Sequence, residues 1–243
     1  MSIFRKKINI SSRVVSIIGM HRSGTSCLAG SLQQKGLFLG KVHEKNDFNL
    51  KGNRENQSIA ELNESILENS GGSWFEPPKK LTWSRKHEKI RNNIIVEFEL
   101  AKVPFWGFKE PRTLITMPFW RKAITDINFV GTFRHPYLVS KSLQHRDSMP
   151  RDYAIKLWKK YNQKMIEIYE EEAFRLISFD LDPSEYLEQI NSAASALGLP
   201  DANSKTIFLD KSLRNSLLEM SDGLISHDAL ALYEKLCNLS KHD

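Results

Sequence analysis

The stretch Gly19-Met20-His21-Arg22-Ser23-Gly24-Thr25-Ser26 decides the fold of this 243-residue chain. It follows an apolar run at 14–18, typical of a buried strand, and precedes residues 27–32, whose apolar spacing predicts a helix. A glycine-bounded loop between a strand and a helix directs backbone N–H groups and the positive helix end toward an anion. The 19–26 loop is therefore expected to bind phosphate.

The loop departs at one position from the G-x-x-x-x-G-K-[ST] pattern of proteins that bind nucleoside triphosphates. Thr25 stands where that pattern has its lysine, and Arg22 supplies a positive charge from inside the loop instead. Because the lysine contacts the β- and γ-phosphates, its absence argues against an ordinary ATPase, GTPase or kinase. The alternative is a plain strand–turn–helix connection with a solvated arginine.

Composition and charge fit an α/β domain that binds anions. Hydrophobic residues make up 40% of the chain and charged residues 26%, with a net charge of +6. No Lys/Arg block is interleaved with aromatics, which argues against a nucleic-acid partner. We expect a flexible N-terminal tail over 1–12 and a single domain with helical insertions over 13–243.

The termini and cysteines favour a cytoplasmic protein. No apolar run approaches the length of a membrane-spanning helix, and the basic start at 1–7 lacks the apolar region of a signal peptide. That start permits only weak peripheral contact with an anionic membrane. Cys27 and Cys237 lie too far apart in sequence to indicate a disulfide framework or a metal site. The oligomeric state is left open.

Apolar periodicity predicts alternating strands and helices. Strands are expected at 14–18, 105–108, 127–133 and 174–179. Helices are expected from 27 to Gly36, around 59–67, 84–102 and 114–120, and at 136–146, 152–172, 183–198 and 227–239, with Pro118 kinking or interrupting one of them. Strands separated by helices imply parallel pairing. The predicted fold is a three-layer α/β sandwich, P-loop-like, around a mostly parallel sheet of four to five strands.

Charged residues follow three of the predicted strands. Arg22 comes after the first, Lys109-Glu110 after the second and Arg134 after the third. Since ligands of an open α/β sheet bind at the carboxyl ends of its strands, these side chains should converge.

Arg134 and Ser142 form a second candidate phosphate site. A strand-end arginine and a hydroxyl two helical turns later can grip one phosphate together, because the guanidinium fork suits phosphate. The alternative is a surface charge and an exposed helix residue.

With these motifs, the chain resembles the bacterial-type sulfotransferases that use 3′-phosphoadenosine 5′-phosphosulfate. The 19–26 loop resembles their 5′-phosphosulfate loop, and Arg134 with Ser142 resembles their 3′-phosphate site. Residues 106–112 are similar to the family's W-G-x-K-[DE]-P-R segment, and 52–56 resembles its glycine-to-Glu-Asn segment. The resemblance covers about residues 13–182.

The resemblance implies the phosphosulfate as donor, its bisphosphate as product, no required metal, and sulfuryl transfer to a hydroxyl or amine. It implies donor contacts from His21, Arg22, Ser23, Gly24, Thr25, Ser26, Arg134 and Ser142. Arg22 should also neutralise charge on the bridging oxygen as the bond to sulfur breaks.

The resemblance favours Glu55 as the general base, with Glu110 as second choice. Lys109 is expected to contact the transferring group. Beside Lys109 and Arg112, the pKa of Glu110 should fall, which suits ion pairing better than proton abstraction. The alternative is that Lys109, Glu110 and Arg112 form a purely structural ion-pair cluster.

The acceptor is expected to be a sugar or glycan precursor. Trp74, Phe75 and Trp83 can stack on a ring or belong to the core. His21, His135 and His145 lack the spacing of metal ligands; the first two lie beside the phosphate-site arginines.

Two other functions stay open. A P-loop kinase or nucleotide-binding protein is disfavoured by the missing lysine and by having only Asp180 as an acidic strand end for magnesium. A non-catalytic relative of sulfotransferases is the other.

Overall fold

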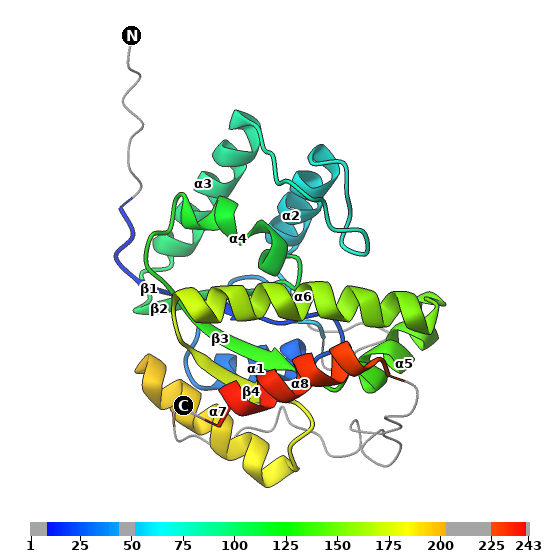
Figure 1. Ribbon diagram of the computed structural model, residues 1–243. Helices are drawn as coiled ribbons and strands as arrows, with labels where there is room; N and C mark the ends of the chain where they lie inside the picture. Colours follow the sequence, from blue (N-terminus) through cyan, green and yellow to red (C-terminus); the bar gives the residue numbers. More distant parts are fainter. Residues whose placement is uncertain (1–8, 44–51, 203–224, 242–243) are drawn as a thin grey trace.

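The computed structural model of the protein describes residues 9–43, 52–202 and 225–241. At its centre lies a four-stranded sheet in the order β2-β1-β3-β4, in which every pairing is parallel (Figure 1). The strands are β1 Arg13–Ile18, β2 Phe105–Lys109, β3 Ile127–Phe133 and β4 Arg175–Ser178. Val15 of β1 pairs with Gly107 of β2 and Asn128 of β3. The expected parallel sheet is confirmed.

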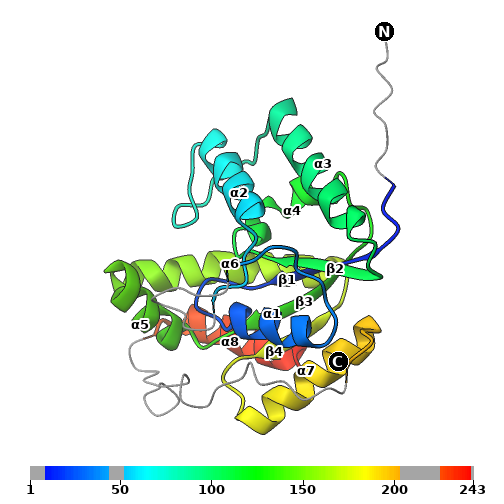
Figure 2. The same ribbon diagram turned by 180° about the vertical axis from the view of Figure 1, so that it is seen from behind.

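Helices cover both faces of the sheet, which confirms the three-layer sandwich (Figures 1 and 2). Val15 and Ile17 point into one core, with α1 Thr25–Gln34 and α7 Pro183–Leu197. Val14 and Ile18 point into the other core, to which the remaining helices contribute. These are α2 Gln57–Asn69, α3 Arg85–Leu100, α4 Thr113–Arg121, α5 Pro136–Asp147, α6 Arg151–Glu171 and α8 His227–Leu239. Strands buried on both faces explain the continuous apolar runs of the sequence.

The predicted elements agree with the observed ones to within a few residues. Pro118 does not interrupt α4, which continues through it to Arg121. Asp182 caps α7, with its Oδ1 accepting the Ser184 N–H at 2.8 Å.

The chain is already anchored before the first strand. Ser11 donates from its backbone N–H and its hydroxyl to Glu99 Oε2 at 2.9 and 2.8 Å. Trp106 donates to the other oxygen of Glu99 at 2.7 Å, so the start of the domain is tied to α3 and β2. The boundary between a tail at 1–12 and a domain at 13–243 stays a prediction.

The strand order places one crevice at the carboxyl end of β1. In the sheet, β2 lies on one side of β1 and β3 lies on the other. The connections that follow β1 and β2 therefore run in opposite directions across the sheet, and this reversal leaves a crevice at the carboxyl end of β1. Loops after β1, β2 and β3 therefore meet at one edge of the sheet.

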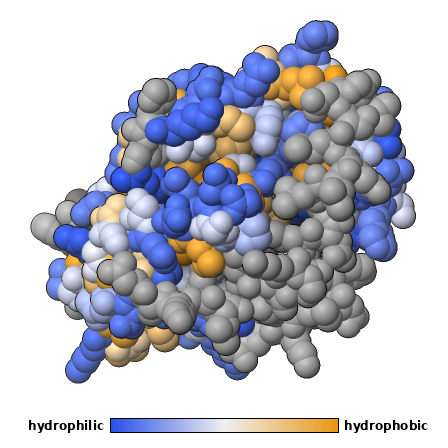
Figure 3. Space-filling model, turned by 90° about the horizontal axis from the view of Figure 1, so that it is seen from below, coloured by the Kyte–Doolittle hydropathy of each residue, from blue (hydrophilic) through white to orange (hydrophobic). Residues whose placement is uncertain are grey.

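Figure 3 shows one face of the molecule. Most of the coloured residues on this face are hydrophilic, and apolar residues are scattered among them. None of the helices in the described ranges combines the length and apolarity needed to cross a membrane.

Candidate functional site

The 19–26 loop presents the N-terminus of α1 at the sheet edge. Gly24 takes a left-handed conformation, with φ at +84°, immediately before the helix. A Cβ there would lie 2.3 Å from the Phe179 ring, so the close approach requires glycine. In the described part of the chain no side chain caps α1. Its first N–H groups and positive dipole end suit an anion.

Arg22 is the loop's half-buried cation. Its Nε donates to Ser142 Oγ of α5 at 2.7 Å, and no carboxylate in the described ranges forms an ion pair with it. Burial, followed by the neighbouring guanidinium groups of Arg146 and Arg134, lowers the pKa of Arg22. The loop thus holds a cation among like charges, an environment that favours an anionic ligand.

Arg134 is held at the end of β3 by the chain that follows β4. Its Nε lies 3.6 Å from Asp180 Oδ1, and its guanidinium carbon lies 5.3 Å from the centroid of the Phe179 ring. Asp180 also accepts hydrogen bonds from the His135 N–H at 2.6 Å and the Tyr233 hydroxyl at 3.1 Å. Asp180 therefore joins three elements around Arg134.

Ser142 and Arg134 were expected to grip one phosphate together. The contact that the structure gives Ser142 is with Arg22, which the sequence spacing did not indicate. Ser142 thereby links α5 to the 19–26 loop, and its shared grip with Arg134 stays a prediction.

Lys109 connects the end of β2 to two other segments. Its ammonium lies 2.5 Å from Glu55 Oε1, 2.9 Å from the Asn53 carbonyl oxygen and 3.4 Å from Ser26 Oγ. Asn53 donates to the second oxygen of Glu55 at 3.0 Å. Both oxygens of the expected base therefore accept a hydrogen bond, and Lys109 links Glu55 to Ser26 of the loop.

Glu110 is itself fully buried and lies in a separate network. It accepts a hydrogen bond from Asn63 at 2.6 Å and pairs with Arg112 at 2.5 Å. The Trp120 indole N–H donates to Asn63 Oδ1 at 2.9 Å, which fixes the amide so that its nitrogen faces Glu110. Arg112 also pairs with Glu64.

This burial corrects the expectation for Glu110. Its pKa was expected to fall beside two cations, but burial dominates and raises the pKa, while Arg112 opposes the rise. Lys109 pairs with Glu55 instead, so the three residues of the alternative structural cluster belong to two separate ion pairs.

His21 lies in the loop on the side of α6. It is 9% exposed, and its ring centroid lies 4.6 Å from that of Trp74 and 6.1 Å from that of Tyr161. Among described residues, its Nε2 has no hydrogen-bond partner. Burial, and after it the charges of Arg112 and Arg146, holds the pKa of His21 well below 6.5, so the imidazole is neutral.

The structure separates the other expected aromatic and histidine residues. Phe75 contacts Trp74 edge-on and is exposed, whereas Trp83 packs on Phe119, with their ring centroids 5.5 Å apart. His135 is buried against Tyr233, and His145 is exposed on α5. In the described ranges, Trp74 lies against the loop histidine.

Two solved structures share this arrangement of strands and helices. One is the sulfotransferase domain from the Synechococcus PCC 7002 olefin synthase, with 14% identity, a TM-score of 0.57, and coverage of 96% of this chain and 98% of that one. The other is the sulfotransferase domain from the curacin biosynthetic pathway, with 14% identity, a TM-score of 0.52, and coverage of 93% and 98%. The fold is that of sulfotransferase domains. No family model and no curated protein matches the sequence.

On this sulfotransferase fold, two site residues escaped the sequence analysis. Arg146 lies one turn beyond Ser142 on α5, and this i,i+4 spacing could have placed it near Arg22. Asp180 was considered only as a magnesium ligand. Asp180 follows one predicted strand and Arg134 follows another. This pattern could have indicated the ion pair that the two residues form.

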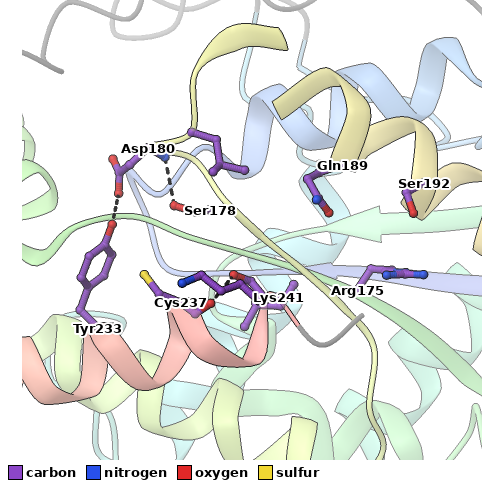
Figure 4. Close-up of a pocket in the computed structure, with 11 residues that line it drawn as sticks. Arg175, Ser178, Asp180, Gln189, Ser192, Tyr233, Cys237 and Lys241 are labelled. Atoms are coloured by element: carbon purple, nitrogen blue, oxygen red, sulfur yellow. Dashed lines mark hydrogen bonds between the residues drawn. The ribbon is translucent and has the colours of Figure 1, made fainter. Parts of the chain in front are cut away.

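A hollow of about 540 Å³ runs along β4 between α7 and α8 (Figure 4). Asp180 and Tyr233 line it at one end, while Arg175 and Gln189 lie farther along. It thus adjoins the support of Arg134 and does not include the 19–26 loop. No group of three or more potential metal-ligating acids, cysteines or histidines occurs within the described ranges.

Proposed function

We propose that the protein is a sulfotransferase that moves the sulfuryl group of 3′-phosphoadenosine 5′-phosphosulfate to an acceptor hydroxyl on a sugar or glycan precursor. The observation that carries the proposal is Arg22. It is a half-buried cation with no carboxylate partner in the described chain, beside an uncapped helix N-terminus and near two further guanidinium groups. Such a site lacks only its anion.

The polar atoms of the loop fit the 5′-phosphate end of this donor. Ser23 Oγ is buried, and in the part of the chain described here it has no hydrogen-bond partner. The hydroxyls of Thr25 and Ser26 lie in the first turn of α1. Together with the helix N–H groups, these atoms would hold the 5′-phosphate, with His21 and Gly24 completing the loop.

Arg134 and Ser142 would hold the 3′-phosphate. The ion pair with Asp180 holds Arg134 in position, and Ser142 accepts a hydrogen bond from Arg22. A second phosphate site at Arg134 and Ser142, in addition to the one in the 19–26 loop, would favour a nucleoside bisphosphate over a linear triphosphate.

The transfer itself would be an in-line displacement. Glu55 would accept the proton of the acceptor hydroxyl, whose oxygen forms the new bond to sulfur while the bond from sulfur to the phosphate oxygen breaks. Lys109 would face the transferring oxygens from its place beside Glu55 and Ser26. Arg22 would neutralise the charge left on the bisphosphate product. Glu110 stays the second candidate for the base.

The kinase alternative requires a carboxylate that can hold magnesium near the loop. Asp180, the acid considered for that role, already receives the His135 N–H and the Tyr233 hydroxyl and lies against Arg134. This arrangement supports a positioning role for Asp180.

Isothermal titration tests the proposal directly. The wild-type protein should bind 3′-phosphoadenosine 5′-phosphate without added metal and should bind ATP with magnesium far more weakly. Tight ATP–magnesium binding, with none of the bisphosphate, would overturn the proposal in favour of a nucleotide-binding protein. Bisphosphate binding without transfer to any acceptor would identify a non-catalytic relative.

A further inference from the structure

We propose that His21 and Trp74 form the acceptor subsite, and that this subsite takes an uncharged, hydroxyl-bearing ring. The inference rests on the proposed function and deepens it by naming two side chains and a substrate class. His21 would hydrogen-bond a hydroxyl of the acceptor, while Trp74 would bound the ring beside it.

The first support is the unpartnered imidazole. His21 is nine-tenths buried, yet within the described residues its Nε2 makes no hydrogen bond. Leaving a buried polar group unpaired costs free energy, so native proteins rarely do so without a ligand or water that completes it. His21 directly precedes Arg22, the residue assigned to the breaking bond, and the charge of Arg22 is among those that lower the pKa of His21.

The second support is the fixed position of Trp74. Its carbonyl oxygen accepts the Tyr161 hydroxyl at 2.8 Å, which ties this segment to α6. Its indole meets the His21 ring at 4.6 Å between centroids, and the guanidinium carbon of Arg146 lies 5.5 Å from its centroid. The side chain is half-buried, so part of its surface remains accessible. An aromatic wall with a few polar groups is the usual lining of a small-molecule site.

The third support is the pairing of charges around His21. The cations that lower its pKa are Arg112, Arg146, Lys109 and Arg22. Three of them already have carboxylate partners: Arg112 pairs with Glu110 and Glu64, Arg146 with Asp147, and Lys109 with Glu55.

The fourth cation, Arg22, is assigned to the donor. No positive charge around His21 is therefore left for an acidic acceptor. Because the imidazole is neutral, it can both donate and accept hydrogen bonds to hydroxyl groups. An uncharged polyhydroxylated ring fits this chemistry better than an anionic one.

The test uses the full-length protein, radiolabelled donor, and methyl glycosides of N-acetylglucosamine and of glucuronic acid as probes. Transfer should be faster to the neutral glycoside. His21→Phe keeps the ring packing on Trp74 but removes both nitrogens, and it should raise the acceptor KM about 10-fold, the size of one lost hydrogen bond. His21→Asn, which restores a polar group, should recover part of this loss. Trp74→Ala should raise the same KM.

Bisphosphate affinity, measured by titration, distinguishes failure of the acceptor subsite from failure of the proposed function. Affinity for the bisphosphate should fall by a smaller factor than the acceptor KM rises in each variant, whereas an equal loss of bisphosphate and acceptor binding would assign His21 to the donor loop and overturn the inference. Preference for the glucuronide, or transfer to neither glycoside by a protein that binds the bisphosphate, would overturn the assigned substrate class. Failure of the wild type to bind the bisphosphate would instead overturn the proposed function.

A readout without turnover covers variants that fold poorly. The ¹³C-labelled His21 imidazole signal, assigned by its absence in His21→Phe, should shift when the neutral methyl glycoside is added in the presence of the bisphosphate. An unchanged signal at saturating glycoside contradicts the contact.

Discussion

Arg22 gives the sharpest prediction, because its replacement should weaken ligand binding without weakening the fold. Arg22→Met keeps most of the aliphatic stem and removes the charge. In the apo protein this substitution loses the hydrogen bond to Ser142 but also removes repulsion from Arg146 and Arg134. The two effects oppose each other, so the free energy of unfolding should change by less than about 1 kcal/mol.

Binding should respond differently, since nothing else in the loop supplies a guanidinium fork. A hydrogen bond to a charged group contributes about 1.5–3 kcal/mol, which corresponds to about 10- to 150-fold in affinity for 3′-phosphoadenosine 5′-phosphate. Urea unfolding with and without the bisphosphate measures both quantities on one sample. The stabilisation by ligand should shrink accordingly, because it depends on the logarithm of ligand concentration over Kd.

Arg134→Met provides the contrast. It leaves Asp180 buried without its cation, so it should lower stability by about 3 kcal/mol or more as well as affinity. Arg134→Met with Asp180→Asn should recover part of the stability and none of the affinity. Arg121→Met, remote on α4 and paired with Glu171, should leave binding unchanged.

The reasoning about Arg22 fails under either of two results. One is a wild-type Kd for the bisphosphate in Arg22→Met. The other is a loss of apo stability as large as that of Arg134→Met, which would make Arg22 a structural cation.

Three further predictions concern other parts of the site. Gly24→Ala should lower both stability and bisphosphate affinity because its Cβ meets Phe179, whereas Gly71→Ala, at a similar φ of +72° with open surroundings, should cost only about 1 kcal/mol in unfolding experiments. Glu55→Gln should keep bisphosphate affinity within a few-fold but reduce single-turnover transfer about 10²- to 10⁴-fold; an equal loss in Glu110→Gln alone would reverse the assignment. Because burial raises the pKa of Glu110 above its unfolded value, the wild type should lose stability relative to Glu110→Gln as pH rises from about 4.5 toward 7 in urea titrations, and a flat difference contradicts this.

Most of the fold could be predicted from the sequence because its signals are local. Apolar runs of strand length separated by amphipathic helices fix an α/β order, and the run at 127–133 appears as β3 without a change of bounds. The edge strand β4 is shorter than the predicted 174–179, since only 175–178 find partners on β3. Of the two effects expected of Pro118, interruption of the helix is contradicted, because α4 continues through it to Arg121.

The site was predictable only in part, because its partners are distant in sequence. Strand-end position was enough to bring Arg22, Lys109 and Arg134 to one edge. Sequence could not assign Lys109 to Glu55, since the contact depends on where the segment before α2 returns over β2. Nor could it indicate that burial outweighs two neighbouring cations at Glu110, because burial is a property of the packed α2–α4 layer.

The threonine at the lysine position of the loop also has a physical account. A loop lysine would bring its ammonium to the phosphates from α1 itself. Here Lys109 places an ammonium beside the loop from the neighbouring strand, with its Nζ 3.4 Å from Oγ of Ser26, the residue next to Thr25. That ammonium is held by Glu55 and the Asn53 carbonyl, so its position depends on the segment that carries the proposed base. A change that removes the Lys109 ammonium or the hydrogen-bond acceptor of Glu55 should therefore disturb both the donor side and the acceptor side of the site, whereas Glu55→Gln keeps that acceptor.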